Sequence, residues 1–84
     1  MEYNAVAEII KKYVLDSVNI DSIDNDMDIF EEGLVSSLFA IELMTFLEKN
    51  FEIKITTSDL DMDNYRCINN ITEFVCEKKG DDNR

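Results

Sequence analysis

Apolar residues recur at helical spacing near both ends of the chain. In residues 4–18 they stand at positions i, i+3, i+4, i+7 and i+8, which form one face of a helix. The residues on that face are Val6, Ile9, Ile10, Tyr13 and Val14. A second amphipathic pattern consists of Ile68, Ile71, Phe74 and Val75. These patterns predict a first helix over residues 4–18 and a last helix that runs to Lys79, where Gly80 stops it.

Residues 38–51 are apolar over most of the circumference of a helix. One stripe consists of Ala40, Ile41, Met44 and Leu47, and another of Phe39, Leu43 and Phe46. A helix of this kind is either central in a bundle, or packs on the core with one side and meets partners with the other. The pattern alone leaves both arrangements open.

The segment between these helices, residues 18–36, has no helical period and is rich in Asp, Asn and Ser. Such side chains compete for backbone hydrogen bonds and favour turns, so we predict a long loop. A loop of this length in a small domain is more often functional or packed down than idle. Its expected anchors to the core are Ile23, Ile29, Phe30 and Leu34.

The sequence around Ile53 and Ile55 resembles a strand, but a single strand has nothing to pair with. We therefore predict an extended connector here. A short helical turn over residues 57–63 follows it, with Thr57 or Ser58 as the capping residue.

The predicted fold is an all-α, small four-helix bundle, made of three principal helices, one short helix and a long first loop. We expect residues 1–79 to form this helical domain and residues 80–84 to be a flexible C-terminal tail. A chain of 84 residues makes one domain at most, and a core of this size rarely leaves room for an enclosed catalytic pocket. The length therefore argues against most enzymes.

The composition excludes several kinds of catalytic and metal-binding site. The chain contains no His, which excludes Ser-His-Asp triads and HExxH metal sites. An EF-hand calcium loop needs Gly at its sixth position and Glu at its twelfth, and the Asp-rich stretches that begin at Asp24 and Asp59 have neither. We expect no metal site and no catalytic residue.

The two cysteines, Cys67 and Cys76, occur in a chain without a signal-peptide-like N-terminus. We therefore predict free thiols in a reducing compartment. The apolar runs are short and broken by charge, so none is expected to span a membrane. The expectation is a monomeric, cytoplasmic protein.

The net charge of −11 is concentrated in the middle of the chain. Residues 16–63 hold thirteen acidic residues against Lys49 and Lys54 alone. Such a charge repels nucleic-acid phosphates and anionic membrane surfaces, so we expect neither partner. Two interpretations remain, a solvated face that keeps the protein soluble and a docking surface for basic partners.

A pair of serines, Ser36 and Ser37, stands where the acidic loop meets the most apolar helix. One of them is expected to cap the helix. A serine at a helix start has a second use, because the free N–H groups and the positive end of the helix dipole stabilise a phosphate attached there. With no base in the chain to activate it, this hydroxyl is better suited to modification by another enzyme than to attack on a substrate.

The run from Asp28 to Met44, which includes Gly33-Leu34-Val35-Ser36-Ser37-Leu38, resembles the phosphopantetheine attachment region of acyl carrier proteins and of peptidyl and D-alanyl carrier proteins. The similarity continues without a gap from Phe46 to Ile55. It rests on the spacing from the serine to several later positions. These are Glu42, Leu47, Glu48, Phe51 and Ile55.

This resemblance implies a function. Ser37, followed by Leu38, would receive 4′-phosphopantetheine from coenzyme A, and the thiol of that arm would carry the cargo as a thioester. The protein would then be a substrate of enzymes and not an enzyme. A phosphopantetheinyl transferase and cargo-loading and cargo-transferring enzymes with basic docking surfaces would be its partners.

The attachment motif departs from the family pattern at one position, because Ser36 stands where Asp precedes the modified serine in the family. Phe39 after Ser-Leu is similar to stand-alone carriers, and its side chain is either part of the core or an exposed contact for partners. By the same resemblance, Glu42 and the acids near it would form a negative docking face. The expected partner-binding residues are Ser36, Leu38, Phe39, Glu42, Glu48, Glu31 and Glu32.

Our first hypothesis is an acyl carrier protein of a polyketide, related secondary-metabolite or fatty-acid-type pathway. One alternative is an aminoacyl, peptidyl or D-alanyl carrier protein. A second alternative, from another class, is a small acidic interaction protein that is never modified.

Overall fold

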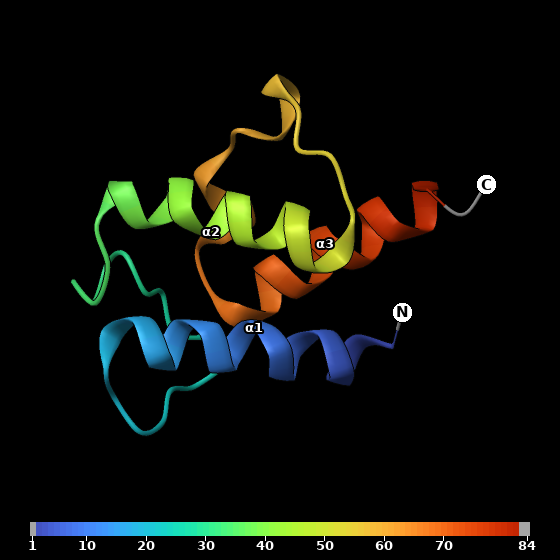
Figure 1. Ribbon diagram of the computed structural model, residues 1–84. Coiled ribbons are helices and arrows are strands. Elements are labelled where there is room, and N and C mark those ends of the chain that lie inside the picture. The colour runs from blue at the N-terminus through green and yellow to red at the C-terminus, as the bar shows by residue number, and fades with distance from the viewer. Residues whose placement is uncertain (1, 83–84) are drawn as a thin grey trace.

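The computed structural model describes residues 2–82, and these residues form an all-helical fold (Figure 1). Three α-helices, α1 (Tyr3–Val18), α2 (Ser37–Phe51) and α3 (Ile68–Asp82), are joined by a long loop and by a segment with two 3-10 turns, η1 (Thr57–Asp59) and η2 (Met62–Tyr65). This confirms the predicted helical bundle with a long first loop. The expected short helix is two separate 3-10 turns.

The most extensive helix–helix contact joins α1 and α3. In Figure 1, α1 and α2 run across the view, and the yellow-to-orange segment with η1 and η2 rises on the side of α2 away from α1. Tyr13 of α1 stacks on Phe46 and Phe39 of α2, with ring centroids 4.0 Å and 5.8 Å away. These aromatic contacts connect the first two helices.

Side chains from all three α-helices and from the long loop between α1 and α2 form the hydrophobic core. Its fully buried members include Val6, Ile10, Val14, Ile29, Leu43, Leu47, Tyr65, Ile68, Ile71 and Val75. Burying a side chain of this size is worth about 1.5–3 kcal/mol. The loop anchors behave as predicted, since Ile23 and Ile29 are buried and Phe30 and Leu34 pack against the core.

The helix ends show one wrong prediction. Gly80 does not stop the last helix, because α3 continues through it to Asp82. A helix is stopped by a left-handed residue, and among the described residues positive φ occurs at Asn19 (59°), Glu52 (54°) and Gly33 (76°) only. Gly80 keeps a helical backbone, where glycine costs only about 1 kcal/mol relative to alanine. Of the proposed tail 80–84, residues 83 and 84 lie outside the described part of the chain.

The capping residue of the short turn was also misassigned. Thr56, rather than Thr57 or Ser58, precedes η1 and forms a capping box with Asp59. The Thr56 N–H donates to Asp59 Oδ2 at 2.9 Å, and Lys78 Nζ of α3 lies 2.7 Å from the same oxygen. The carboxylate of Asp59 therefore ties η1 to α3.

Candidate functional site

Ser37 is the first residue of α2, and its side chain is exposed. Ser36 occupies the N-cap position with an extended backbone (φ −104°, ψ 174°), and its carbonyl accepts a hydrogen bond from the Phe39 N–H at 3.0 Å. The Ser36 hydroxyl makes no capping hydrogen bond, and the first turn of α2 contains no acidic residue. The positive end of the α2 dipole is thus left without a carboxylate at its start.

This arrangement accommodates a phosphate ester on Ser37. The hydroxyl is exposed, and the first N–H groups of a helix point towards the position that an attached phosphate would take. The missing cap and the missing acid leave those donors and the dipole available to a negative group. Ser37 therefore fits 4′-phosphopantetheine as its covalent group.

The backbone leading to Ser37 is a series of hydrogen-bonded turns. Asp28 Oδ1 accepts the N–H groups of Phe30 and Glu31 at 3.0 Å and 2.9 Å, which caps the first turn. Gly33 then adopts a left-handed φ of 76°, which a residue with a side chain reaches only with strain. Behind it, the carbonyl of Ile29 accepts the N–H groups of Leu34 (3.1 Å) and Val35 (3.4 Å).

The loop is also fastened to the segment between η2 and α3. The Ile29 N–H donates to the carbonyl of Arg66 at 2.9 Å, and Arg66 Nε pairs with Asp28 Oδ2 at 3.3 Å. Further along, the Asn69 N–H donates to the carbonyl of Asn25 at 3.0 Å. Residues some forty positions later in the sequence thus hold the loop that precedes Ser37.

The face of α2 next to Ser37 carries two exposed apolar side chains. Leu38 and Ile41 are 64% and 61% exposed, the highest values among the large apolar residues described. Glu42 is exposed on the same helix. The pKa of Tyr13 on α1 is raised mainly by burial of its side chain and secondly by the negative charge of Glu42. Leu38, Ile41 and Glu42 are therefore exposed side chains of α2, and Ile41 was not among the site residues expected from the sequence.

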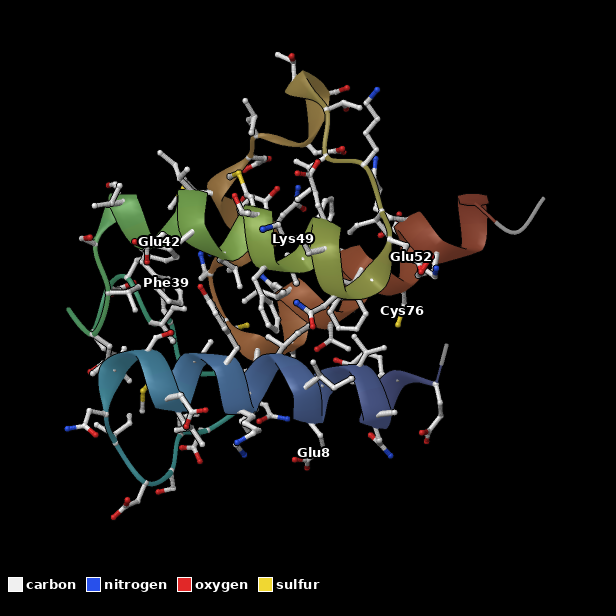
Figure 2. The ribbon with its side chains drawn as sticks, viewed as in Figure 1. Glu8, Phe39, Glu42, Lys49, Glu52 and Cys76 are labelled. Atoms are coloured by element: carbon white, nitrogen blue, oxygen red, sulfur yellow. The ribbon has the colours of Figure 1, made fainter. Side chains whose placement is uncertain are left out.

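Phe39 is part of the core and not an exposed partner contact. Its side chain is 7% exposed and lies between α2 and α1, where it stacks on Tyr13 (Figure 2). The interpretation of Phe39 as an exposed apolar contact is therefore wrong. It failed because Phe39 lies about 100° around the helix from its exposed neighbour Leu38, on the side that packs against α1.

Glu48 has a structural contact that the sequence did not reveal. Its side chain is half-buried, and its Oε2 accepts the Ile55 N–H at 2.9 Å. This bond holds the connector after α2 to the side of the helix. Glu31 and Glu32, in contrast, are exposed on the turn that Asp28 caps, a few residues before Ser37.

No group of three or more His, Cys, Asp or Glu side chains is arranged to hold a metal ion within residues 2–82. No helix in this part of the chain is both long and apolar enough to cross a membrane. Cys67 is buried and Cys76 is half-buried, and both are free thiols.

The chain was compared with known protein families and proteins. Residues 4–75 match the family model described as "Phosphopantetheine attachment site". The D-alanyl carrier protein of Lactococcus lactis subsp. lactis (strain IL1403) is 43% identical over 56 residues, which is 67% of this chain and 71% of the relative. The D-alanyl carrier protein of Streptococcus sanguinis (strain SK36) is 33% identical over 72 residues, which is 86% of this chain and 87% of the relative.

These similarities extend over most of the described helices, from α1 into α3. The prosthetic group of the family is covalently attached 4′-phosphopantetheine, and its members are carriers rather than enzymes. Transferases and acylating enzymes are their general class of partner. The chain belongs to the family of phosphopantetheine-binding carrier proteins.

Proposed function

We propose that Ser37 is the residue that receives 4′-phosphopantetheine and that the chain is an aminoacyl carrier of the D-alanyl type. The observation that carries the first part is the exposed Ser37 hydroxyl at the start of α2, beside N–H groups that no side chain caps. The second part rests on the relatives described above, which are named D-alanyl carrier proteins.

The modification needs a second protein. A bond forms between Ser37 Oγ and phosphorus, the pyrophosphate bond of coenzyme A breaks, and 3′,5′-ADP leaves. The chain has no His to take the hydroxyl proton, so a base of the transferase accepts it. Ser37 contributes the nucleophilic oxygen, and the start of α2 stabilises the attached phosphate.

The proposed cargo replaces the one in our first hypothesis. The relatives described above are named D-alanyl carrier proteins, which favours the aminoacyl alternative over a polyketide or fatty-acid cargo. The thiol of the arm would hold the amino acid as a thioester. Cys67 and Cys76 take no part, because the arm supplies its own sulfur.

Partner enzymes would dock on α2 and on the turn before it. Leu38 and Ile41 offer an exposed apolar contact beside the modified residue, and Glu31, Glu32 and Glu42 surround it with negative charge. Charges of this kind mainly speed encounter and fix orientation. A small apolar contact with a charged rim gives affinity low enough for the carrier to move between enzymes.

The attachment step is tested by intact mass after incubation with coenzyme A and a phosphopantetheinyl transferase of broad specificity. We expect the wild-type chain and Ser36→Ala to gain the mass of one phosphopantetheine and Ser37→Ala to gain none. Ser36→Ala is the matched control, because it removes the neighbouring hydroxyl. An unmodified wild-type chain, or a gain that follows Ser36, would overturn the assignment.

The cargo is tested on the modified protein in two parallel reactions. One contains D-alanine, ATP and a D-alanine-activating ligase, and the other contains malonyl-coenzyme A and an acyltransferase. We expect the mass of one alanyl group in the first reaction, lost on treatment with hydroxylamine as expected of a thioester. Loading in the second reaction only would overturn the D-alanyl proposal and leave Ser37 as the attachment residue.

A further inference from the structure

We propose that Arg66 is a positioning residue for Ser37: through Asp28 and Ile29 it fixes the loop that presents the attachment serine to the transferase. This inference rests on the proposed function of Ser37. It concerns a residue in a different part of the sequence, between η2 and α3, to which neither the family resemblance nor the sequence pattern gives a role.

Arg66 holds the loop in two independent ways. Its backbone carbonyl accepts the Ile29 N–H at 2.9 Å, and its Nε pairs with Asp28 Oδ2 at 3.3 Å. The other end of the guanidinium pairs with Asp63 of η2. A planar guanidinium can bond two carboxylates at once through separate nitrogens, so Arg66 joins the loop to η2 in a fixed relative position.

The two residues that Arg66 contacts, Asp28 and Ile29, form the hydrogen bonds that hold the rest of the loop. Asp28 caps the turn through the N–H groups of Phe30 and Glu31 with one oxygen and meets Arg66 with the other. Ile29 is fully buried, and its carbonyl holds Leu34 and Val35. The path from Arg66 to Ser36 therefore consists of consecutive hydrogen-bonded units.

The exposure of the two partners sets how much the ion pair contributes to stability. The Arg66 side chain is 53% exposed and that of Asp28 only 23%. A pair with one exposed partner contributes little to global stability, about 0–1 kcal/mol. Its removal is therefore expected to loosen the loop without unfolding the bundle, because the buried core side chains, Ile29 among them, are unchanged.

The test measures the rate of phosphopantetheine transfer to Arg66→Gln and Asp28→Asn. Asparagine keeps an oxygen that can cap the turn and removes the charge that faces Arg66. We expect each variant to lower kcat by roughly fivefold, because a misplaced nucleophile is inefficient even in the docked complex. The double variant should be no slower than either single one, since both remove the same contact.

Two matched controls separate positioning from charge and from stability. Lys12→Gln removes one positive charge from the exposed Lys12–Asp16 pair on α1, and Lys78→Gln breaks the Asp59 contact far from the loop. Both should keep the wild-type kcat at a temperature at which every variant is folded by circular dichroism. The extra negative charge of Arg66→Gln would by itself speed encounter with a basic enzyme, so a slower reaction cannot come from lost long-range attraction.

The proposal is overturned if Arg66→Gln reacts as fast as Lys12→Gln, if the losses of the two single variants multiply in the double variant, or if Lys78→Gln slows to the same degree. These outcomes differ from a failure of the proposed function, in which the wild-type chain itself gains no mass.

Discussion

Lys78 Nζ on α3 lies 2.7 Å from Asp59 Oδ2 on η1, and both side chains are largely shielded from solvent. The same oxygen accepts the Thr56 N–H, and the Asp59 carbonyl accepts the Tyr65 hydroxyl at 2.8 Å. One residue thus fastens the segment between α2 and α3 by its side chain and by its backbone.

The Asp59–Lys78 contact should make stability depend on pH below about 4. The hydrogen bond from Lys78, and after it the Thr56 N–H, lowers the pKa of Asp59 from its ordinary 3.8. Because the folded pKa lies below the unfolded one, the contribution is complete above pH 3.8 and is lost as the pH falls through the folded value. Asp59→Asn should cost about 1 kcal/mol at neutral pH.

Chemical denaturation of Asp59→Asn between pH 2.5 and 7 checks this. The variant should show a flatter loss of stability in acid than the wild type. Asp16→Asn is the control, because the Lys12–Asp16 pair is 70–80% exposed and should contribute almost nothing. Equal effects of the two substitutions would contradict the assigned role of Asp59.

Tyr65 should make the fold sensitive to alkali. Burial first, and nearby carboxylates second, raise the pKa of Tyr65 from 10.0 to about 12. Between these values the unfolded chain loses the hydroxyl proton while the folded chain keeps it, so stability falls as the pH rises through this range. Denaturation at pH 9 and pH 11.5 should show the loss in the wild type and a smaller one in Tyr65→Phe. Tyr3→Phe, at an exposed position, should keep most of the wild-type loss.

Ser36 should respond to substitution unlike an ordinary N-cap. Because its hydroxyl makes no capping bond, Ser36→Ala should cost only a few tenths of a kcal/mol, below the usual range of about 0.5–2. Ser36→Asp places a carboxylate at the start of α2 and should stabilise the protein by about 0.5–1 kcal/mol. Thermal unfolding of both variants measures these changes. A loss above about 1 kcal/mol in Ser36→Ala would mean that the hydroxyl caps α2 in solution.

The exposed Ile41 should matter to partners and not to the fold. Ile41→Ser keeps a similar helix propensity and should leave the melting temperature almost unchanged. Its loading by the amino-acid ligase should need a roughly fivefold to tenfold higher carrier concentration, since an apolar anchor beside the site is lost. Leu43→Ala, in the core, is the opposite control and should destabilise the protein by about 2–4 kcal/mol. Unchanged loading of Ile41→Ser would remove Ile41 from the docking surface.

Glu42 and Glu48, the two acidic residues of α2, should differ in role: Glu42 should act in docking and Glu48 in stability. Glu42→Lys should slow loading most at low salt and leave the free energy of unfolding nearly unchanged, because an exposed charge acts at long range and is screened. Glu48→Lys should also destabilise the protein, by about 1–3 kcal/mol, because the Ile55 N–H loses its acceptor. Stopped-flow loading at two salt concentrations, with denaturation of each variant, distinguishes them. Similar stability losses in both would contradict this division.

The helices, and the serine proposed as the attachment residue, could be predicted because their signals are local. Helical spacing placed α1 and α2 to within a residue, and the spacing after the serine pair singled out Ser37. The anchors Ile23 and Ile29 could be recognised as isolated apolar residues within a polar loop. Each of these features is set by neighbours within a few turns of chain.

The features that were missed depend on residues far apart in sequence. Phe39 is buried where it stacks on Tyr13 of α1. The Glu48 carboxylate accepts the Ile55 N–H, and the Arg66 guanidinium pairs with Asp28 of the long loop. No pattern within a single helix or loop encodes such pairings, since they follow from how the helices pack.

The fastening of the loop by Arg66 bears on when the protein becomes a substrate during its synthesis. Ser37 is synthesised before Arg66, and α2 alone does not supply the acceptor for the Ile29 N–H or the cation for Asp28. A nascent chain that ends before Arg66 therefore contains the serine but not the structure that presents it. Under the proposed role of Arg66, phosphopantetheine transfer to Ser37 is therefore expected only once the chain extends past Arg66.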